Sequence, residues 1–310
     1  MMETENNWQR FTLAMAVPVL TGFAAVGMAV IYFKQYGFFV FVLLPVHLGF
    51  LSNALYGKTG MGKVLSNTFF VLLFTSIPIL VFALEGAICL AMAFPLAFGL
   101  AFLGSLLGML TWDIGKKSIG IAPLLFLVFT PFLLSFESSH QSAPTVHQVV
   151  STVEINAPIE TVWRNVIAFP EIEKPPEGIL RLGFAYPINA KIEGAGVGAI
   201  RRCNFNTGAF VEPITVWQEP NLLAFDVAEQ PAPMTELSPY DNLQAAHLEY
   251  IKSQRGQFRL YKKDGKTAVE GTTFYTHDIA PDFYWNLFSD EIIHRIHLRV
   301  LNHIKEVSEQ

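Results

Sequence analysis

The C-terminal segment of the chain carries the side chains whose types and spacing come nearest to a metal or acid–base site. His294 and His297 are three residues apart in HRIHLRVLNH, so a helix would place both on one face, and His303 follows further along. Two imidazoles hold a metal ion only with further ligands, which this spacing does not supply. The sequence therefore predicts no metal site, and it predicts His297 as a buried, hydrogen-bonded residue.

A second group of polar side chains lies in the middle of the chain. Arg202, Asn204 and Asn206 alternate in RRCNFN, so they would share one face of a strand, and Glu212 lies in the next stretch. If that face is concave, an Arg–Glu pair would orient a polar group of a ligand at the bottom of an apolar pocket. If it is convex, these are solvated side chains, and a slip of one residue reverses the assignment. The same two alternatives apply to Arg259 and His277.

Aromatic side chains are abundant in the second half of the chain, and some must form core while a subset lines a pocket. They are Phe205, Phe210, Trp217, Phe225, Phe258, Phe274, Trp285 and Phe288. The residues predicted to contact a ligand are Arg202, Asn204, Glu212, Trp217, Phe258, Phe274, His277, Trp285, Phe288 and His297. No residue is predicted to be catalytic, because the sequence shows no nucleophile–base pair and no glycine-rich phosphate loop.

Composition and charge exclude several classes of protein. The net charge of −5 leaves no basic surface for nucleic acid, so no nucleic-acid partner is expected. The two cysteines, Cys89 and Cys203, lie in chemically different halves and predict no disulfide framework. No cofactor is predicted.

The elements that position these residues fall into two parts. Only 15% of the 310 residues are charged, against about 25% in an ordinary soluble domain, and the deficit lies in the first half. A membrane span needs about 20 apolar residues. The segments that qualify are 11–33, 36–56, 64–84, 86–110 and 119–136, joined by short loops. They predict a compact membrane bundle over residues 1–136, followed by a polar linker over 137–148.

Basic residues in short loops mark the cytoplasmic side of a membrane protein. With five spans, one side of the membrane holds Arg10, Lys58, Lys63, Lys116 and Lys117, and the other holds Lys34 and Glu85. This predicts a multi-pass cell membrane protein with a cytoplasmic N-terminus and the C-terminal domain outside, in a periplasm or extracellular space. If 119–136 does not span, the domain is cytoplasmic.

Two features inside the predicted spans have alternative explanations. Gly104 and Gly108 in GSLLG are one turn apart, which favours close helix packing. His47, next to Pro45 within the second span, is either a neutral histidine bonded to a neighbouring helix or part of a functional site.

The second half alternates between strand and helix patterns. Val149, Ser151, Val153 and Ile155 alternate with polar neighbours as in a half-buried strand, and a helix follows Pro158. Strands are predicted at 198–206, 209–218 and 222–228, and Asp264-Gly265 predicts a tight hairpin turn within 256–277. The segment after Pro281 reads as one long amphipathic helix. The predicted fold of residues 149–310 is a curved antiparallel sheet covered by this helix.

The stretch VEINAPIETVWRNV, the middle hairpins and the long final helix resemble the START-like helix-grip (SRPBCC) superfamily, which includes polyketide cyclase/dehydrase-like proteins. The resemblance covers about residues 146–308 and implies an internal cavity for a lipid, a sterol, a polyketide or another hydrophobic molecule. It implies no single reaction, because the family shares no catalytic set.

The expected function is membrane-anchored binding or transfer of such a hydrophobic small molecule, with membrane lipids as further partners. A cyclase- or dehydratase-type enzyme acting on a membrane-derived substrate is one alternative, which the sequence favours less. An accessory or sensory protein with a membrane-protein partner is another. Residues 229–250 are longer than a hairpin needs, and form either a lid over the pocket, a membrane contact or an ordinary surface loop.

Overall fold

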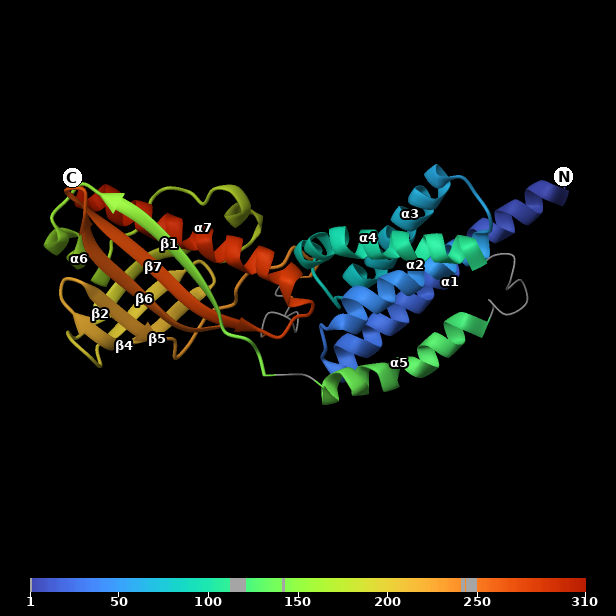
Figure 1. The fold of residues 1–310 in the computed structure, drawn as a ribbon, viewed down its shortest axis with the longest axis horizontal. Coiled ribbons are helices and arrows are strands. Elements are labelled where there is room, and N and C mark those ends of the chain that lie inside the picture. The colour runs from blue at the N-terminus through green and yellow to red at the C-terminus, as the bar shows by residue number, and fades with distance from the viewer. Residues whose placement is uncertain (1, 112–120, 141–142, 241–242, 244–249) are drawn as a thin grey trace. The chain divides into compact units, whose positions relative to one another are not determined.

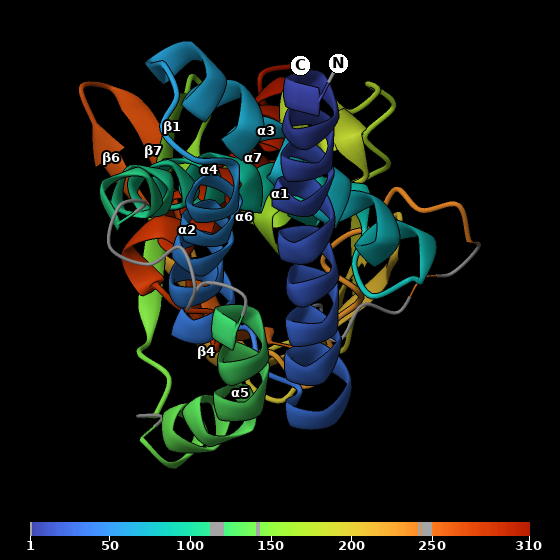
Figure 2. The same ribbon diagram turned by 90° about the vertical axis from the view of Figure 1, so that its right-hand side faces the viewer.

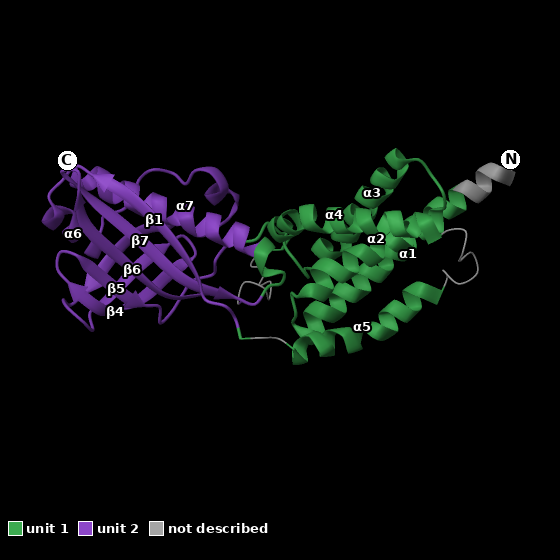
Figure 3. Ribbon diagram, in the orientation of Figure 1, with its two compact units in different colours: residues 1–143, 236–246, 279–284 green, residues 144–235, 247–278, 285–310 purple. Residues whose placement is uncertain are grey.

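The computed structural model describes residues 2–111, 121–140, 143–240, 243 and 250–310 (Figure 1). The chain divides into two compact units (Figure 3). The helical unit comprises residues 1–143, 236–246 and 279–284, and the sheet unit comprises 144–235, 247–278 and 285–310.

Among the described residues, the helical unit contains five helical segments that are long and apolar enough to cross a membrane. They are Trp8–Phe33, Phe39–Tyr56, Met61–Val81, Ala87–Thr111 and Ala122–Ser139. Their helices are α1 (Met2–Gly27), η1 (Met28–Phe33), η2 (Phe39–Leu43), α2 (Leu44–Tyr56), α3 (Met61–Val81), α4 (Ala87–Thr111) and α5 (Ala122–Ser139). The short segments η1 and η2 are π-helical, and α1 and α2 run side by side (Figures 1 and 2). The five predicted apolar helices are confirmed.

Glycines allow α2 and α4 to approach closely. A Cβ atom on Gly104 would lie 1.9 Å from the Val46 carbonyl oxygen, and one on Gly108 would lie 2.3 Å from that of Phe50. Gly49 faces α4 in the same way, with the Ala101 carbonyl 1.8 Å from its virtual Cβ. Such distances exclude any side chain, so the close helix packing predicted for GSLLG is confirmed.

Some polar side chains inside the helical unit have hydrogen-bond partners, whereas the buried His47 Nε2 atom has none among the described residues. Ser105 of α4 lies 2.7 Å from the Thr68 hydroxyl of α3 and donates to the Gly49 carbonyl at 3.2 Å. His47 stacks on Phe126 with ring centroids 3.7 Å apart. Glu85 lies in the turn between α3 and α4, where it accepts a hydrogen bond from the Tyr36 hydroxyl. A hydroxyl that bonds within the bundle is accommodated without water.

The sheet unit is built on one seven-stranded antiparallel sheet in the order β1-β7-β6-β5-β4-β3-β2. The strands are β1 (His147–Ile155), β2 (Pro187–Glu193), β3 (Ile200–Phe205), β4 (Gly208–Gln218), β5 (Leu222–Asp226), β6 (Ile251–Lys263) and β7 (Lys266–His277). Lys263 pairs with Lys266 across a two-residue turn in which Asp264 and Gly265 have φ of 51° and 77°. These angles are typical of a hairpin turn that matches strand twist, and the predicted turn is confirmed.

Two α-helices complete the sheet unit, α6 (Ile159–Ile167) and the long α7 (Asp282–Ser308), which belongs to this unit from Trp285 onward and lies against the sheet there (Figure 1). Its residues Val300, Leu301 and Ile304 share one apolar core with Trp163 of α6 and with the sheet. A curved antiparallel sheet that holds a long C-terminal helix is the helix-grip fold, as expected.

The sequence did not predict the strand β2 or the short 3₁₀ helix η4 (Gly178–Leu182). In this strand the apolar residues Ile188, Ala190 and Ile192 alternate with polar ones. The prolines on its N-terminal side are typical of a loop, so no strand was predicted here. At the unit boundary, α5 continues to Ser139 and β1 begins at His147.

Replacing Gly104 by alanine should destabilise the helical unit, because the new methyl group overlaps the Val46 carbonyl and overpacking costs about 1–3 kcal/mol. The matched control is Gly99→Ala in the same helix, where no atom lies within 4 Å of the virtual Cβ. We expect a lower melting temperature for Gly104→Ala in detergent and an unchanged or higher one for Gly99→Ala. Equal melting temperatures would contradict the packing account.

Candidate functional site

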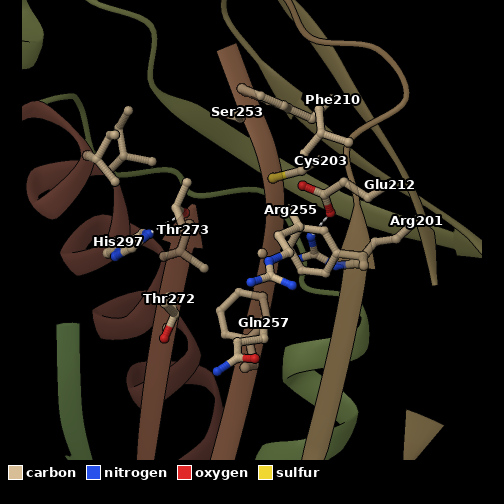
Figure 4. Close-up of a pocket in the computed structure, with 18 of the residues that line it drawn as sticks. Arg201, Cys203, Phe210, Glu212, Ser253, Arg255, Gln257, Thr272, Thr273 and His297 are labelled. Carbon is tan, nitrogen blue, oxygen red and sulfur yellow. Dashed lines mark hydrogen bonds and ion pairs between the residues drawn. The ribbon is translucent and has the colours of Figure 1, made fainter. Parts of the chain in front are cut away.

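A cavity of about 110 Å³ lies in the sheet unit between the sheet and α7 (Figure 4). Strands β3 to β7 and helix α7 contribute its walls, which are mostly apolar. The lining residues are Arg201, Cys203, Phe205, Phe210, Glu212, Phe225, Val227, Ser253, Arg255, Gly256, Gln257, Phe258, Gly271, Thr272, Thr273, Ile293, Ile296, His297 and Val300. Glycines at 256 and 271 keep two adjacent strands free of side chains at this point.

A buried ion pair forms one side of the cavity. Arg201 of β3 and Glu212 of β4 are cross-strand neighbours, and the Arg201 Nη1 atom donates to the Glu212 carboxylate. Their side chains are only 2% and 7% exposed. Arg201 Nε donates to the Ile167 carbonyl at 3.1 Å, which ties the end of α6 to the same guanidinium. Removing either charge would leave the other buried and uncompensated.

Aromatic rings surround the Arg201 guanidinium. The ring centroids of Phe169, Phe225 and Phe258 lie 5.8, 5.7 and 5.5 Å from its central carbon. The Arg201 Nη2 atom is buried and has no hydrogen-bond partner among the described residues. The Cys203 thiol, a weak acceptor, also interacts with this guanidinium. Arg201 Nη2 can therefore donate to a stronger oxygen acceptor in an apolar environment, where a hydrogen bond is worth more than at the surface.

Burial changes the acid–base properties of the residues beside the pair. It raises the pKa of the Glu212 carboxyl, and the guanidinium of Arg201 opposes that shift. Burial also raises the pKa of the Cys203 thiol to about 12. Cys203 is thus a neutral thiol at physiological pH. The charged residues in the lining are the buried ion pair and the exposed Arg255.

Hydroxyl groups hold a histidine on the opposite side of the cavity. His297 Nε2 lies 2.7 Å from the Thr273 hydroxyl, and His297 Nδ1 lies 3.0 Å from the Ser151 hydroxyl. The Ser151 hydroxyl is also 2.7 Å from His294 Nδ1. Burial, together with nearby His294, lowers the pKa of His297 to about 4. His297 is therefore neutral at physiological pH. Its predicted hydrogen bonding is confirmed, and its side chain is partly rather than fully buried.

Three of the residues predicted to contact a ligand line the cavity: Glu212, Phe258 and His297. The structure brings Glu212 and Phe258 together with Arg201, and Figure 4 shows Arg201 and Glu212 apart from Thr273 and His297. The other predicted residues lie elsewhere in the sheet unit.

The predicted arginine partner of Glu212 is wrong by one residue. Arg202 is about half exposed and lies 3.6 Å from Glu193 on the outer face of the sheet. Asn204, on that same face of β3, donates to the Asn189 side chain at 2.7 Å. The inward residues of β3 are Arg201, Cys203 and Phe205. The sequence could have predicted this register from the apolar residues Cys203 and Phe205, because alternate residues of a strand share one face and Arg201 lies on the same face as these two.

Five further predicted residues are placed away from the cavity lining. Trp217 packs edge-on against Trp163, with ring centroids 5.7 Å apart. The Phe274 ring lies 4.2 Å from the Arg255 guanidinium carbon. His277 stacks on His147 and bonds Asn286 at 2.6 Å, and Trp285 lies beside Phe288. Among the described residues no group of three metal ligands occurs.

The long loop predicted as a lid is only partly described. Met234 forms a bridge with Phe184 in the sheet unit, whereas the stretch from Glu236 belongs to the helical unit. There the Glu236 carboxylate accepts a hydrogen bond from the Ile88 N–H at 3.2 Å, at the start of α4. Residues 241–242 and 244–249 lie outside the described residues, so the lid remains a prediction.

No family model and no curated protein sequence matches the chain. Solved structures of helix-grip proteins match about half of it. A protein from Nitrosospira multiformis is 18% identical with a TM-score of 0.35, over 52% of this chain and 96% of that one. The Zhui aromatase/cyclase from Streptomyces sp. R1128 is 15% identical with a TM-score of 0.35, over 53% and 94%. Truncated norcoclaurine synthase from Thalictrum flavum is 12% identical with a TM-score of 0.35, over 54% and 96%.

Two neighbouring arginines give a matched test of the buried pair. Arg201→Met should destabilise the sheet unit by about 3–5 kcal/mol, because it leaves Glu212 charged and buried. Arg202→Met removes only an exposed pair, worth about 0–1 kcal/mol. Denaturant unfolding of the full chain in detergent measures both. Similar losses for the two variants would contradict the assigned register.

The low pKa of His297 predicts an acid-sensitive fold. The folded protein binds this proton less readily than the unfolded chain, whose histidine pKa is about 6.5, so the stabilisation is present above pH 6.5 and is lost as the pH falls towards 4. Full protonation would cost about 3 kcal/mol. His297→Gln should flatten the pH dependence of unfolding between pH 4 and 6.5. An unchanged slope would show that other groups control acid stability.

Proposed function

We propose that the cavity of the sheet unit binds a small, mainly apolar molecule whose one hydrogen-bond acceptor faces Arg201, and that the helical unit anchors this pocket in a membrane. The observation that carries the proposal is a cavity lined by aromatic and aliphatic side chains, beside a buried Arg201 Nη2 atom that has no oxygen acceptor among the described residues. Apolar walls with a few convergent polar groups are typical of small-molecule sites.

The size of the cavity limits the ligand. A volume of about 110 Å³ is somewhat below that of an engineered apolar cavity of about 150 Å³ that takes up benzene. It therefore accommodates one ring, or one end of a longer molecule such as a lipid, sterol or polyketide. A complete sterol does not fit within this volume unless the lining side chains move. We therefore expect the part of the ligand inside the cavity to be a ring-sized group.

The charge of the buried ion pair favours a neutral acceptor beside Arg201, because Glu212 already neutralises this guanidinium. The exposed Arg255 adds one positive charge to the rest of the lining. A carbonyl, ether or hydroxyl oxygen satisfies Arg201 Nη2 without adding charge. The cavity should bind a ligand with such an oxygen more tightly than a pure hydrocarbon, because a hydrocarbon leaves the buried Arg201 donor without an acceptor.

The helical unit supports the membrane part of the proposal by length and composition. The excess of basic residues in alternate loops favours a cytoplasmic N-terminus and a sheet unit on the outer side of the membrane. A pocket for apolar molecules in the same chain would collect ligands that partition into the bilayer. Its partners would then be membrane lipids and the hydrophobic ligand itself.

Two probes of the same shape test this function. Acetophenone and α-methylstyrene differ only in C=O against C=CH₂, and both are ring-sized. With the full chain in nanodiscs, ligand-observed NMR should detect both probes competing for one site, with acetophenone bound about tenfold more tightly, the worth of about one hydrogen bond. Absence of specific binding by both probes would contradict the proposed function.

The double variant Arg201→Met/Glu212→Leu assigns the preference to the ion pair. Replacing both charges by apolar groups avoids leaving one of them buried alone, and such replacements are often tolerated. We expect this variant to bind both probes with similar affinity. Arg202→Met serves as the control, and it should retain the preference for acetophenone because its side chain lies on the outer face.

A further inference from the structure

Four side chains form a continuous hydrogen-bonded chain that begins at the cavity. Its members are Thr273 of β7, His297 of α7, Ser151 of β1 and His294 of α7. The successive distances are 2.7 Å from Thr273 to His297, 3.0 Å from His297 to Ser151 and 2.7 Å from Ser151 to His294. Thr273 and His297 line the cavity, whereas Ser151 and His294 lie behind them.

The order of hydroxyl and imidazole groups in this chain allows it to be polarised in either direction. In one polarity Thr273 donates to His297 Nε2, His297 Nδ1–H donates to Ser151, and Ser151 donates to His294 Nδ1. In the other, every donor becomes an acceptor. Ser151 donates once and accepts once in both arrangements, Thr273 changes between donor and acceptor, and the two histidines only change tautomer.

A histidine buried for packing alone needs one partner for its N–H. His297 has a hydroxyl at each ring nitrogen, and a hydroxyl can both give and take a proton at the same position. Burial keeps His297 neutral, which suits a tautomeric relay because no buried imidazolium has to form on it. The far end is His294, which is partly exposed.

We propose that these four side chains are a proton relay, and that the cavity thereby acts as a general acid–base site for a ligand with a weakly acidic C–H or O–H group, such as a carbon next to a carbonyl. This inference rests on the proposed binding function. Thr273 is the residue that contacts the ligand, and the other three act through it.

The step conserves protons and needs no other reagent. The ligand C–H or O–H bond breaks and its proton goes to the Thr273 oxygen, while the Thr273 hydroxyl proton moves to His297 Nε2. The proton on His297 Nδ1 moves to Ser151, and that of Ser151 moves to His294 Nδ1. The products are the ligand anion and a protonated His294, which solvent deprotonates. Positioned acid–base groups of this kind accelerate reactions by about 10²–10⁴-fold.

Solvent isotope exchange on a defined probe tests the relay. Acetophenone is incubated with the full chain in nanodiscs in D₂O, and NMR follows replacement of its methyl protons by deuterium. The relay predicts exchange at least about 100-fold faster with protein than with empty nanodiscs. Thr273→Val should still bind acetophenone but lose the acceleration, and Thr273→Ser should restore it, because only the hydroxyl matters.

Two further variants separate the relay from a structural role. Ser151→Ala interrupts the chain behind the cavity wall, so it should slow exchange without changing probe affinity. Thr276→Val, on the same strand but outside the cavity lining, should have no effect on either. Binding without faster exchange in the unmodified protein would overturn the relay and leave the binding function standing. Failure of acetophenone to bind would instead contradict the binding function, and the relay with it.

Discussion

A guanidinium that has no access to water must find its charge and hydrogen-bond partners inside the protein. Arg201 does so through Glu212 on the neighbouring strand, the Ile167 carbonyl at the end of α6, and three aromatic rings. The pair thereby links the sheet to the first helix of its unit and fixes which face of β3 points inward. Replacing both charges of such a pair by hydrocarbon of similar volume is often neutral or stabilising, which is consistent with the ligand-binding role that we propose for the pair.

The sequence predicted the architecture well because its signals are periodic. Apolar runs of span length, the Asp264-Gly265 turn and the stripe of α7 each depend on local chemistry, and each appears in the structure. The predicted site depended on which face of β3 points inward, and two adjacent arginines leave that choice open. Choosing Arg202 instead of Arg201 placed the predicted ion pair on the outer face of the sheet. The contacts of His297 with Thr273 and Ser151 join residues far apart in sequence, which spacing alone could not reveal.

The cavity has two polar sides with different properties. On one side the ion pair carries compensated charges, and the Arg201 Nη2 atom has no oxygen acceptor among the described residues. On the other, His297 and its hydroxyl partners are neutral and can exchange donor and acceptor roles. Between them lie apolar walls formed by Phe225, Phe258 and Ile296. A ligand with an oxygen at one end and a labile hydrogen nearby would use both sides.

Native mass spectrometry of the full chain measures whether the cavity holds one small molecule per chain. The matched variant is Gly271→Leu, because a Cβ at this lining position meets Phe258 and Leu301 at ordinary contact distances of 3.5 and 3.8 Å. We expect a ring-sized or ring-ended molecule bound one to one to the unmodified protein and absent from the folded variant. The same molecule bound to both proteins, or no small molecule bound to either, would show that the cavity is not a binding site.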